Sequence, residues 1–281
     1  NKNVTWSLSG NIGVNESKIV KLGFPEAAYG NETYKAYLGN PIGDHFGTAN
    51  IFIVGKAPGL FWGYKTDGII QTGESTATGL PTSSKFVMTP GNIRVVDVTG
   101  DGIIDDKDKT IIGDPNPDFT YGFQTSLKVN DLTLSASFNG VQGGQIFNGN
   151  RRYERMPSQQ TANFTSEAYT NAWRANAQSN LYPSLTSSLK NEAYDMYIED
   201  GSFLRCSDIT LGYVLPEKTS KVIGFNTINI FASVKNSFLI TEYSGYDPEM
   251  RTFSFDGLRP GIDLNSYTNP RQFVLGLNLG F

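Results

Sequence analysis

The sequence predicts an all-β protein in which about six long strands form part of an antiparallel transmembrane β-barrel. Three observations lead to this class: alternating apolar and polar side chains, abundant glycine and aromatic residues, and long connections that alternate with short ones. The 281 residues include 30 Gly, 14 Tyr and 18 Phe. Aromatic side chains favour strands and glycine favours turns, so the composition indicates β-structure rather than disorder.

The first strand is expected at residues 3–15. From residue 4 to residue 14, the even positions hold Val, Trp, Leu, Gly, Ile and Val, and the odd positions hold Thr, Ser, Ser, Asn and Gly. A period of two places these sets on opposite faces of a strand. The apolar set can therefore face either a protein core or lipid.

The same alternation predicts five later strands. Strands at 119–129 and 132–142 are joined only by Asn130 and Asp131, which predicts a hairpin. Pro216 ends the strand at 204–214, because proline cannot continue a ladder of hydrogen bonds. The last two strands are expected at 227–237 and 272–281. In the final strand, every odd position from 273 to 281 is Phe or Leu.

The connections between these strands alternate in length. Those at 130–131 and 216–226 are short or moderate, whereas those at 16–118, 143–203 and 238–271 are long. A compact soluble domain rarely carries such connections. Outer-membrane barrels combine short periplasmic turns with longer extracellular loops, so the pattern favours a barrel with its C-terminus in the periplasm. A soluble β-sandwich, whose strands also alternate, is the competing interpretation.

Charge and residue types exclude several classes of function. The net charge is −4 and the sequence pI is about 5.1, so no nucleic-acid partner is expected. No apolar run approaches the roughly 20 residues of a membrane helix, although a membrane strand needs only about 9–11. His45 and Cys206 are the only residues of their types. Neither has the neighbours of a nucleophilic site, so no enzymatic activity is expected.

One acidic segment, residues 97–108, matches the twelve-residue calcium loop D-x-[DN]-x-[DN]-G-x5-E with two departures. Thr99 replaces Asp or Asn at the third position, and Asp108 replaces Glu at the twelfth. We expect a weak, structural calcium site, with magnesium as second choice; a solvated acidic turn without metal is the alternative. The predicted ligands are Asp97, Thr99, Asp101, the Ile103 carbonyl, Asp105 and Asp108.

Aromatic residues in the long connections are candidates for binding cargo. Sugar rings stack on exposed aromatic faces, and peptides also pack on them. The candidates are Trp62, Tyr64, Tyr243 and Tyr246. Packing among the loops themselves, or contact with a covering partner, is the alternative role.

Several stretches, in this order, resemble the C-terminal third of SusC/RagA-type TonB-dependent transporters. They are YKTDGI at 64–69, DVTGDGIID at 97–105, IIGDPNPDFTYG at 111–122, EDGSFLR at 199–205, ITLGY at 209–213, YSGYDPE at 243–249, PR at 270–271 and the terminal LGF. Each stretch is weak alone, but together they span most of the chain. The run Cys206-Ser207-Asp208 departs from an apolar–basic–Asn run that is frequent in the family.

The resemblance implies the C-terminal part of a roughly 22-stranded antiparallel transmembrane β-barrel. Its N-terminal plug lies outside this chain, and the loops at 16–118, 143–203 and 238–271 would be extracellular. Six strands cannot close a barrel, and open edges in lipid would leave backbone groups unpaired. The chain is therefore expected to be a fragment that depends on the remainder of its barrel and plug and on outer-membrane lipid.

The resemblance also implies a function and partners. A SusD-like surface lipoprotein would act as a lid, the TonB–ExbB–ExbD machinery would supply energy, and the cargo would be an oligosaccharide or oligopeptide. Phe281 would serve as the C-terminal recognition signal for barrel assembly. The alternative function is that of a soluble or surface carbohydrate-binding β-protein with a structural calcium loop.

Overall fold

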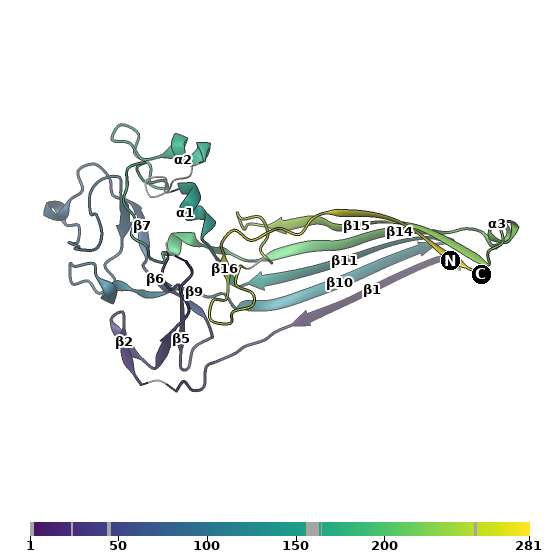
Figure 1. Ribbon diagram of the computed structural model, residues 1–281, viewed down its shortest axis with the longest axis horizontal. Coiled ribbons are helices and arrows are strands. Elements are labelled where there is room, and N and C mark those ends of the chain that lie inside the picture. The colour runs from purple at the N-terminus through teal and green to yellow at the C-terminus, as the bar shows by residue number, and fades with distance from the viewer. Residues whose placement is uncertain (1–2, 24, 44–45, 156–162, 164, 250–251) are drawn as a thin grey trace.

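The computed structural model describes residues 3–23, 25–43, 46–155, 163, 165–249 and 252–281, so His45 lies outside the described residues. Six long strands form one antiparallel sheet in the order β1-β10-β11-β14-β15-β17. Their bounds are Val4–Gly13, Pro117–Val129, Leu132–Gly143, Phe203–Val214, Thr227–Thr241 and Gln272–Gly280. Figure 1 shows this sheet as a long curved ribbon with both chain termini at one end.

All six predicted strands are confirmed within a few residues of their expected bounds. The largest difference is at β15, which continues to Thr241 and so enters the connection predicted to begin at residue 238. Two local irregularities were also not expected. The pairing of β14 with both neighbours shifts between Cys206 and Asp208, and Asn236 has a positive φ of 50°.

The strand register aligns side chains of one kind across the whole sheet. Pairing brings one apolar row together from every strand: Trp6, Leu127, Leu134, Leu211, Ala232 and Leu275. The adjacent positions form a largely polar row: Ser7, Ser126, Ser135, Thr210, Ser233 and Val274. Because directly paired residues share a face, the sheet has one apolar face and one polar face.

The apolar face does not enclose a protein core. Trp6, Leu211 and Leu275 are 67%, 45% and 81% exposed. Sheets of soluble proteins bury such a face against another layer. A continuous exposed apolar face fits a hydrocarbon environment instead. This observation separates the barrel from the competing soluble sandwich.

The long connections fold into a separate packed body beyond the other end of the sheet (Figure 1). Its short strands are β2 Ala27–Tyr29, β3 Glu32–Tyr34, β4 Ala36–Leu38, β5 Asn50–Ile53, β6 Leu60–Gly63, β7 Thr66–Ile69, β8 Ile93–Val95, β9 Thr110–Gly113, β12 Gln145–Asn148, β13 Ile198–Asp200 and β16 Ile262–Asp263. It also contains helices α1 Asn150–Arg155 and α2 Ser166–Asn171, and 3₁₀ turns at Thr76–Thr78, Asp106–Asp108 and Asp195–Tyr197. We call this part the loop body.

Helix α3, Glu217–Val222, lies at the opposite end of the molecule, between β14 and β15. Over the residues that the structure describes, no helix has the length and apolar character needed to cross a membrane.

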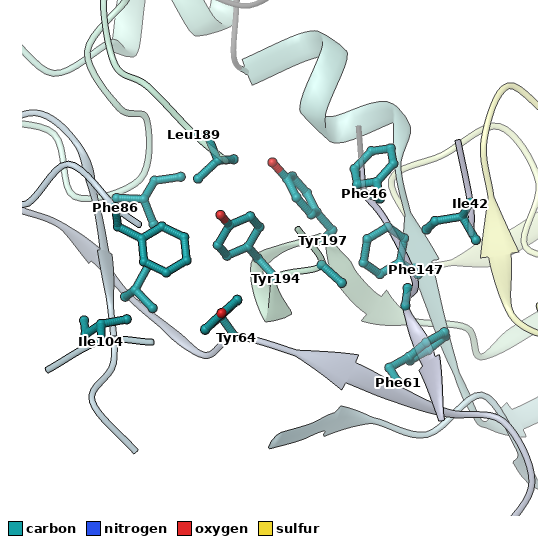
Figure 2. Packing of buried hydrophobic residues seen from close by; sticks show 14 of the residues in the cluster. Ile42, Phe46, Phe61, Tyr64, Phe86, Ile104, Phe147, Leu189, Tyr194 and Tyr197 are labelled. Atoms are coloured by element: carbon teal, nitrogen blue, oxygen red, sulfur yellow. The ribbon is translucent and has the colours of Figure 1, made fainter. Parts of the chain in front are cut away.

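The main hydrophobic core lies inside the loop body (Figure 2). Phe46 and Phe147 meet edge to face, with ring centroids 5.4 Å apart, and Tyr64 and Phe86 do the same at 4.9 Å. Such pairs contribute about 0.5–1.5 kcal/mol beyond their buried area. Ile262 joins the same core. All three long connections therefore fold together, and they are not independent loops.

Candidate functional site

The polar face of the sheet carries an open hollow of about 580 Å³. Its polar lining includes Ser9, Asn11, Gln124, Ser137, Asn139 and Glu249. Five of these side chains come from β1, β10 and β11, and Glu249 comes from the segment after β15. Hydroxyl and amide groups suit hydrogen bonding to polar solutes, and a single carboxylate adds one negative charge.

Arg205 ties the segment after β15 to this polar face. It is 5% exposed, and its Nη2 and Nε lie 2.5 Å from Asp247 Oδ1 and Glu249 Oε2. Asn139 Nδ2 donates to the other Glu249 oxygen at 3.2 Å. Charge-assisted hydrogen bonds between a guanidinium and carboxylates are strong and directional. The segment around 247–249 is therefore held against the wall of the sheet.

The predicted calcium loop is folded by its own hydrogen bonds. Asp97 accepts the Gly100 and Gly102 amides at 2.6 and 2.7 Å, and the Thr99 hydroxyl at 3.0 Å. Burial opposes ionisation of Asp97, but these hydrogen bonds hold its pKa below the usual value. Gly102 has φ 81°, which confirms the sharp turn expected at that position.

Asp108, at the other end of this loop, is fully buried. Its carboxylate accepts the amides of Val98, Thr99 and Asp105 at 2.9–3.1 Å. Within the described residues, which include all of 97–108, no group of three or more His, Cys, Asp or Glu side chains is placed to hold a metal ion. The structure thus brings Asp97 and Asp108 to the same Thr99 but does not gather the predicted ligand set.

A charged network fastens the acidic loop to the core. Lys85 Nζ lies 2.7 Å from Asp106 and 2.5 Å from Glu192, and Lys109 Nζ lies 3.0 Å from Glu192. Tyr64 donates to Asp106 at 3.0 Å. The Lys85 hydrogen bond is the main cause that holds the pKa of Asp106 well below its usual range. Burial is the main cause that raises the pKa of Tyr64.

Three of the four predicted cargo-binding aromatics are not available to a ligand. Trp62, Tyr64 and Tyr243 are at most 5% exposed, because they pack inside the loop body. Tyr243 also donates to buried Asp263 at 2.6 Å, and burial raises its pKa. The expectation of stacking on these three rings is therefore wrong, and packing among the loops accounts for them. Tyr246 is 78% exposed and stays a candidate.

Phe281 follows β17 at the end of the sheet that carries both termini (Figure 1). It is 87% exposed, and its ring centroid lies 5.1 Å from that of Phe225. The position agrees with a strand-end aromatic residue; its role in assembly stays a prediction.

Sequence reasoning missed the paired charges that organise this region. A strict period of two from Ile209 and Leu211 would place Arg205 on the apolar face. The irregularity between Cys206 and Asp208 moves it to the polar face, where it pairs with Asn139, and no local signal in the sequence indicates that shift. Lys85 and Glu192 are 107 residues apart and carry no local signal of their contact.

Comparison with known proteins gives consistent relatives over the full chain, although no family model matches the sequence. TonB-dependent receptor P3 of Formosa agariphila is 31% identical, covering 100% of this chain and 27% of that protein. TonB-dependent receptor SusC of Bacteroides thetaiotaomicron is 28% identical, covering 100% and 25%. The solved RagAB peptide transporter matches with TM-score 0.73 at 22% identity, covering 100% of this chain and 28% of that chain.

The two-faced sheet and its solved neighbour define the class: the chain is a segment of a large antiparallel β-barrel. The curated relatives narrow this to SusC/RagA-type TonB-dependent transporters, which confirms the resemblance seen in the sequence. The chain spans about a quarter of the length of these relatives. Their names describe receptors and transporters, not enzymes, in agreement with the expected lack of catalytic activity.

Proposed function

We propose that this chain contributes barrel wall and outer loops to a TonB-dependent importer of large nutrients. The observation that carries the proposal is the exposed apolar row that crosses all six strands, with the polar face behind it. The apolar face would contact lipid, and the polar face with its hollow would line the path of the cargo. Relatives with TonB-dependent receptor names support this assignment.

The proposed orientation places the loop body outside the cell and both ends of the chain in the periplasm. The tight turn at Asn130 and Asp131 and the connection through α3 lie at the end with the termini (Figure 1). Short periplasmic turns and long extracellular loops are the rule in outer-membrane barrels. The three connections at 16–118, 143–203 and 238–271 would then form the surface that receives cargo and a partner.

The proposed partners follow from the same family assignment. The remainder of the barrel and the plug would complete the pore, a SusD-like lipoprotein would cover the loop body, and TonB–ExbB–ExbD would supply the energy. The solved neighbour is named a peptide transporter, and SusC is the other named relative, so both oligopeptides and oligosaccharides belong in the test.

Uptake by the source bacterium tests this proposal. Deleting the full-length gene should abolish import of one fluorescent oligosaccharide or oligopeptide, and the intact gene should restore it. Import should also stop when tonB is deleted. Unchanged import of every cargo in the deletion strain, or import that survives loss of tonB, would contradict the proposal.

We also propose that the acidic loop at 97–108 binds calcium weakly, with Kd on the order of 10⁻⁴–10⁻³ M. The spacing of its oxygen-bearing residues and the turn at Gly102 support this. Full-length protein in detergent should then melt at higher temperature with 5 mM calcium, about ten times the middle of that range, than with chelator. Asp101→Ala should remove the shift, whereas Asp67→Ala, an exposed acid outside the loop, should keep it. A wild-type protein without any shift would contradict the site.

A further inference from the structure

Helix α3 has an unusual position relative to the apolar face of the sheet. In β15, residues 228, 230, 232 and 234 lie on that face, opposite residues 279, 277, 275 and 273 of β17. Ile230 is 41% exposed, but Ile228 is only 4% exposed. Helix α3 contacts β15, and it is the element next to Ile228 in the chain. The burial of Ile228 next to a helix that contacts the same strand indicates that α3 covers the end of the apolar row, on the outward side of the sheet.

The helix does not bury its own large apolar residues. Ser220 is fully buried, whereas Val222 is 85% and Ile223 is 55% exposed. Two residues along an α-helix correspond to a rotation of roughly 200°, so Val222 points almost directly away from Ser220. β14 and β15 are interior strands of the sheet, so an open sheet edge does not explain this exposure.

The residues around α3 continue the lipid-facing surface. Phe281 is 87% exposed beside Phe225, at the foot of the row formed by β17. Lys218 and Lys221 are also exposed on the helix. Apolar and aromatic side chains next to lysines are the combination found where protein meets the boundary between acyl chains and headgroups.

We propose that α3 is an interfacial anchor that rests in the phospholipid leaflet at the periplasmic end of the barrel. Val222, Ile223 and Phe281 enter the boundary between acyl chains and headgroups, and Lys218 and Lys221 lie at phosphate level. The anchor depends on the outer-membrane location and not on the identity of the cargo, so it can be confirmed or contradicted independently of the import activity.

Spin labels on the full-length transporter test the anchor. The protein is reconstituted in nanodiscs of phosphatidylethanolamine and phosphatidylglycerol, with accessible cysteines elsewhere replaced, and Val222→Cys carries a nitroxide. The matched control is Asp131→Cys. Asp131 is exposed and lies in the turn between β10 and β11, at the same end of the sheet as α3. Collision rates with oxygen, which concentrates in lipid, and with a water-soluble nickel complex give the depth of each label.

The label at position 222 should collide several-fold more often with oxygen than with the nickel complex, and the label at 131 should show the reverse. Equal nickel access at both positions would place α3 in water and overturn the proposal. Protection of the 222 label from both reagents would also overturn it, because that result indicates cover by protein. As a second variant, Lys218→Gln/Lys221→Gln should lower the depth of the 222 label in nanodiscs that contain phosphatidylglycerol.

Discussion

Single charged residues decide how the long connections attach to the sheet. Arg205 is buried on the polar face and holds two carboxylates of the segment after β15. Glu199 performs a similar task inside the loop body, where it accepts Arg151 at 2.7 Å and the Ser244 amide and hydroxyl at 2.8 Å. Both sites link strands to residues that are more than 40 positions away in sequence.

Replacing Arg205 should release the segment around 247–249. Arg205→Met leaves buried Asp247 without its cation, and breaking such a pair costs about 3–5 kcal/mol. Hydrogen exchange by mass spectrometry should show faster exchange at 242–249, with the strands of the sheet unchanged. Lys18→Met removes the exposed pair with Glu16 and should change nothing measurable. Equal protection in wild type and Arg205→Met would show that the ion pair does not anchor this segment.

Acid should loosen the junction at Glu199. Burial raises the pKa of Glu199, but the hydrogen bonds from Ser244 and Arg151 outweigh this and hold it below 4.5. A depressed pKa means stabilisation that is present above 4.5 and lost as pH falls below it, through the folded-state pKa. The melting temperature should therefore fall between pH 5 and pH 3. Glu199→Gln should reduce this fall and lower stability at pH 7; an unchanged pH profile in the variant would exclude Glu199 as a cause.

At the scale of the strands, close packing on the polar face depends on glycine opposite aromatic rings. Phe231 of β15 pairs with Gly276 of β17, and a Cβ atom at Gly276 would lie 2.1 Å from Phe231 Cζ. The ring therefore lies across the glycine, where no side chain competes for the space. This arrangement fixes the pairing of the last two strands of the sheet.

Filling that space should destabilise the sheet. Gly276→Val forces the Phe231 ring out of its position, and overpacking of this kind costs about 1–3 kcal/mol. The folded fraction of the full-length protein, seen as heat-modifiable migration in gels, should decrease. Adding Phe231→Ala should restore part of it. If the double variant folds no better than Gly276→Val alone, the clash between these two residues is not the cause.

For the whole molecule, a charged side chain should be destabilising on the apolar face of the sheet and tolerated on the polar face. Leu134 lies in the apolar row and Ser135, the next residue, lies in the polar row. Leu134→Arg should be destabilising by about 1 kcal/mol, because the cost of a charge on the lipid face is about 2–4 kcal/mol at the midplane but smaller toward the membrane boundary, and Leu134 is the third residue of β11. Ser135→Arg should be tolerated, because it faces the polar side. The fraction folded into outer membranes or vesicles measures both variants, and equal tolerance of the two would contradict the assignment of the faces.

Much of this architecture is already encoded locally. Alternation with a period of two depends only on neighbouring residues, so the sequence determined all six long strands, the two-faced sheet and the hairpin at Asn130 and Asp131. The sequence also predicted the turn at Gly102, because a positive φ is a property of the glycine itself and needs no distant contact.

Tertiary structure alone decided what the long connections do. Trp62, Tyr64 and Tyr243 look like exposed binding aromatics in sequence, but contacts between distant segments bury them. Tyr64 lies in the main core, Trp62 in a second, smaller cluster, and Tyr243 donates to Asp263. The pairing of Lys85 with Glu192 likewise depends on chain segments that meet only after folding. Burial and ion pairing are properties of the three-dimensional neighbourhood, whereas strand alternation is a property of the chain itself.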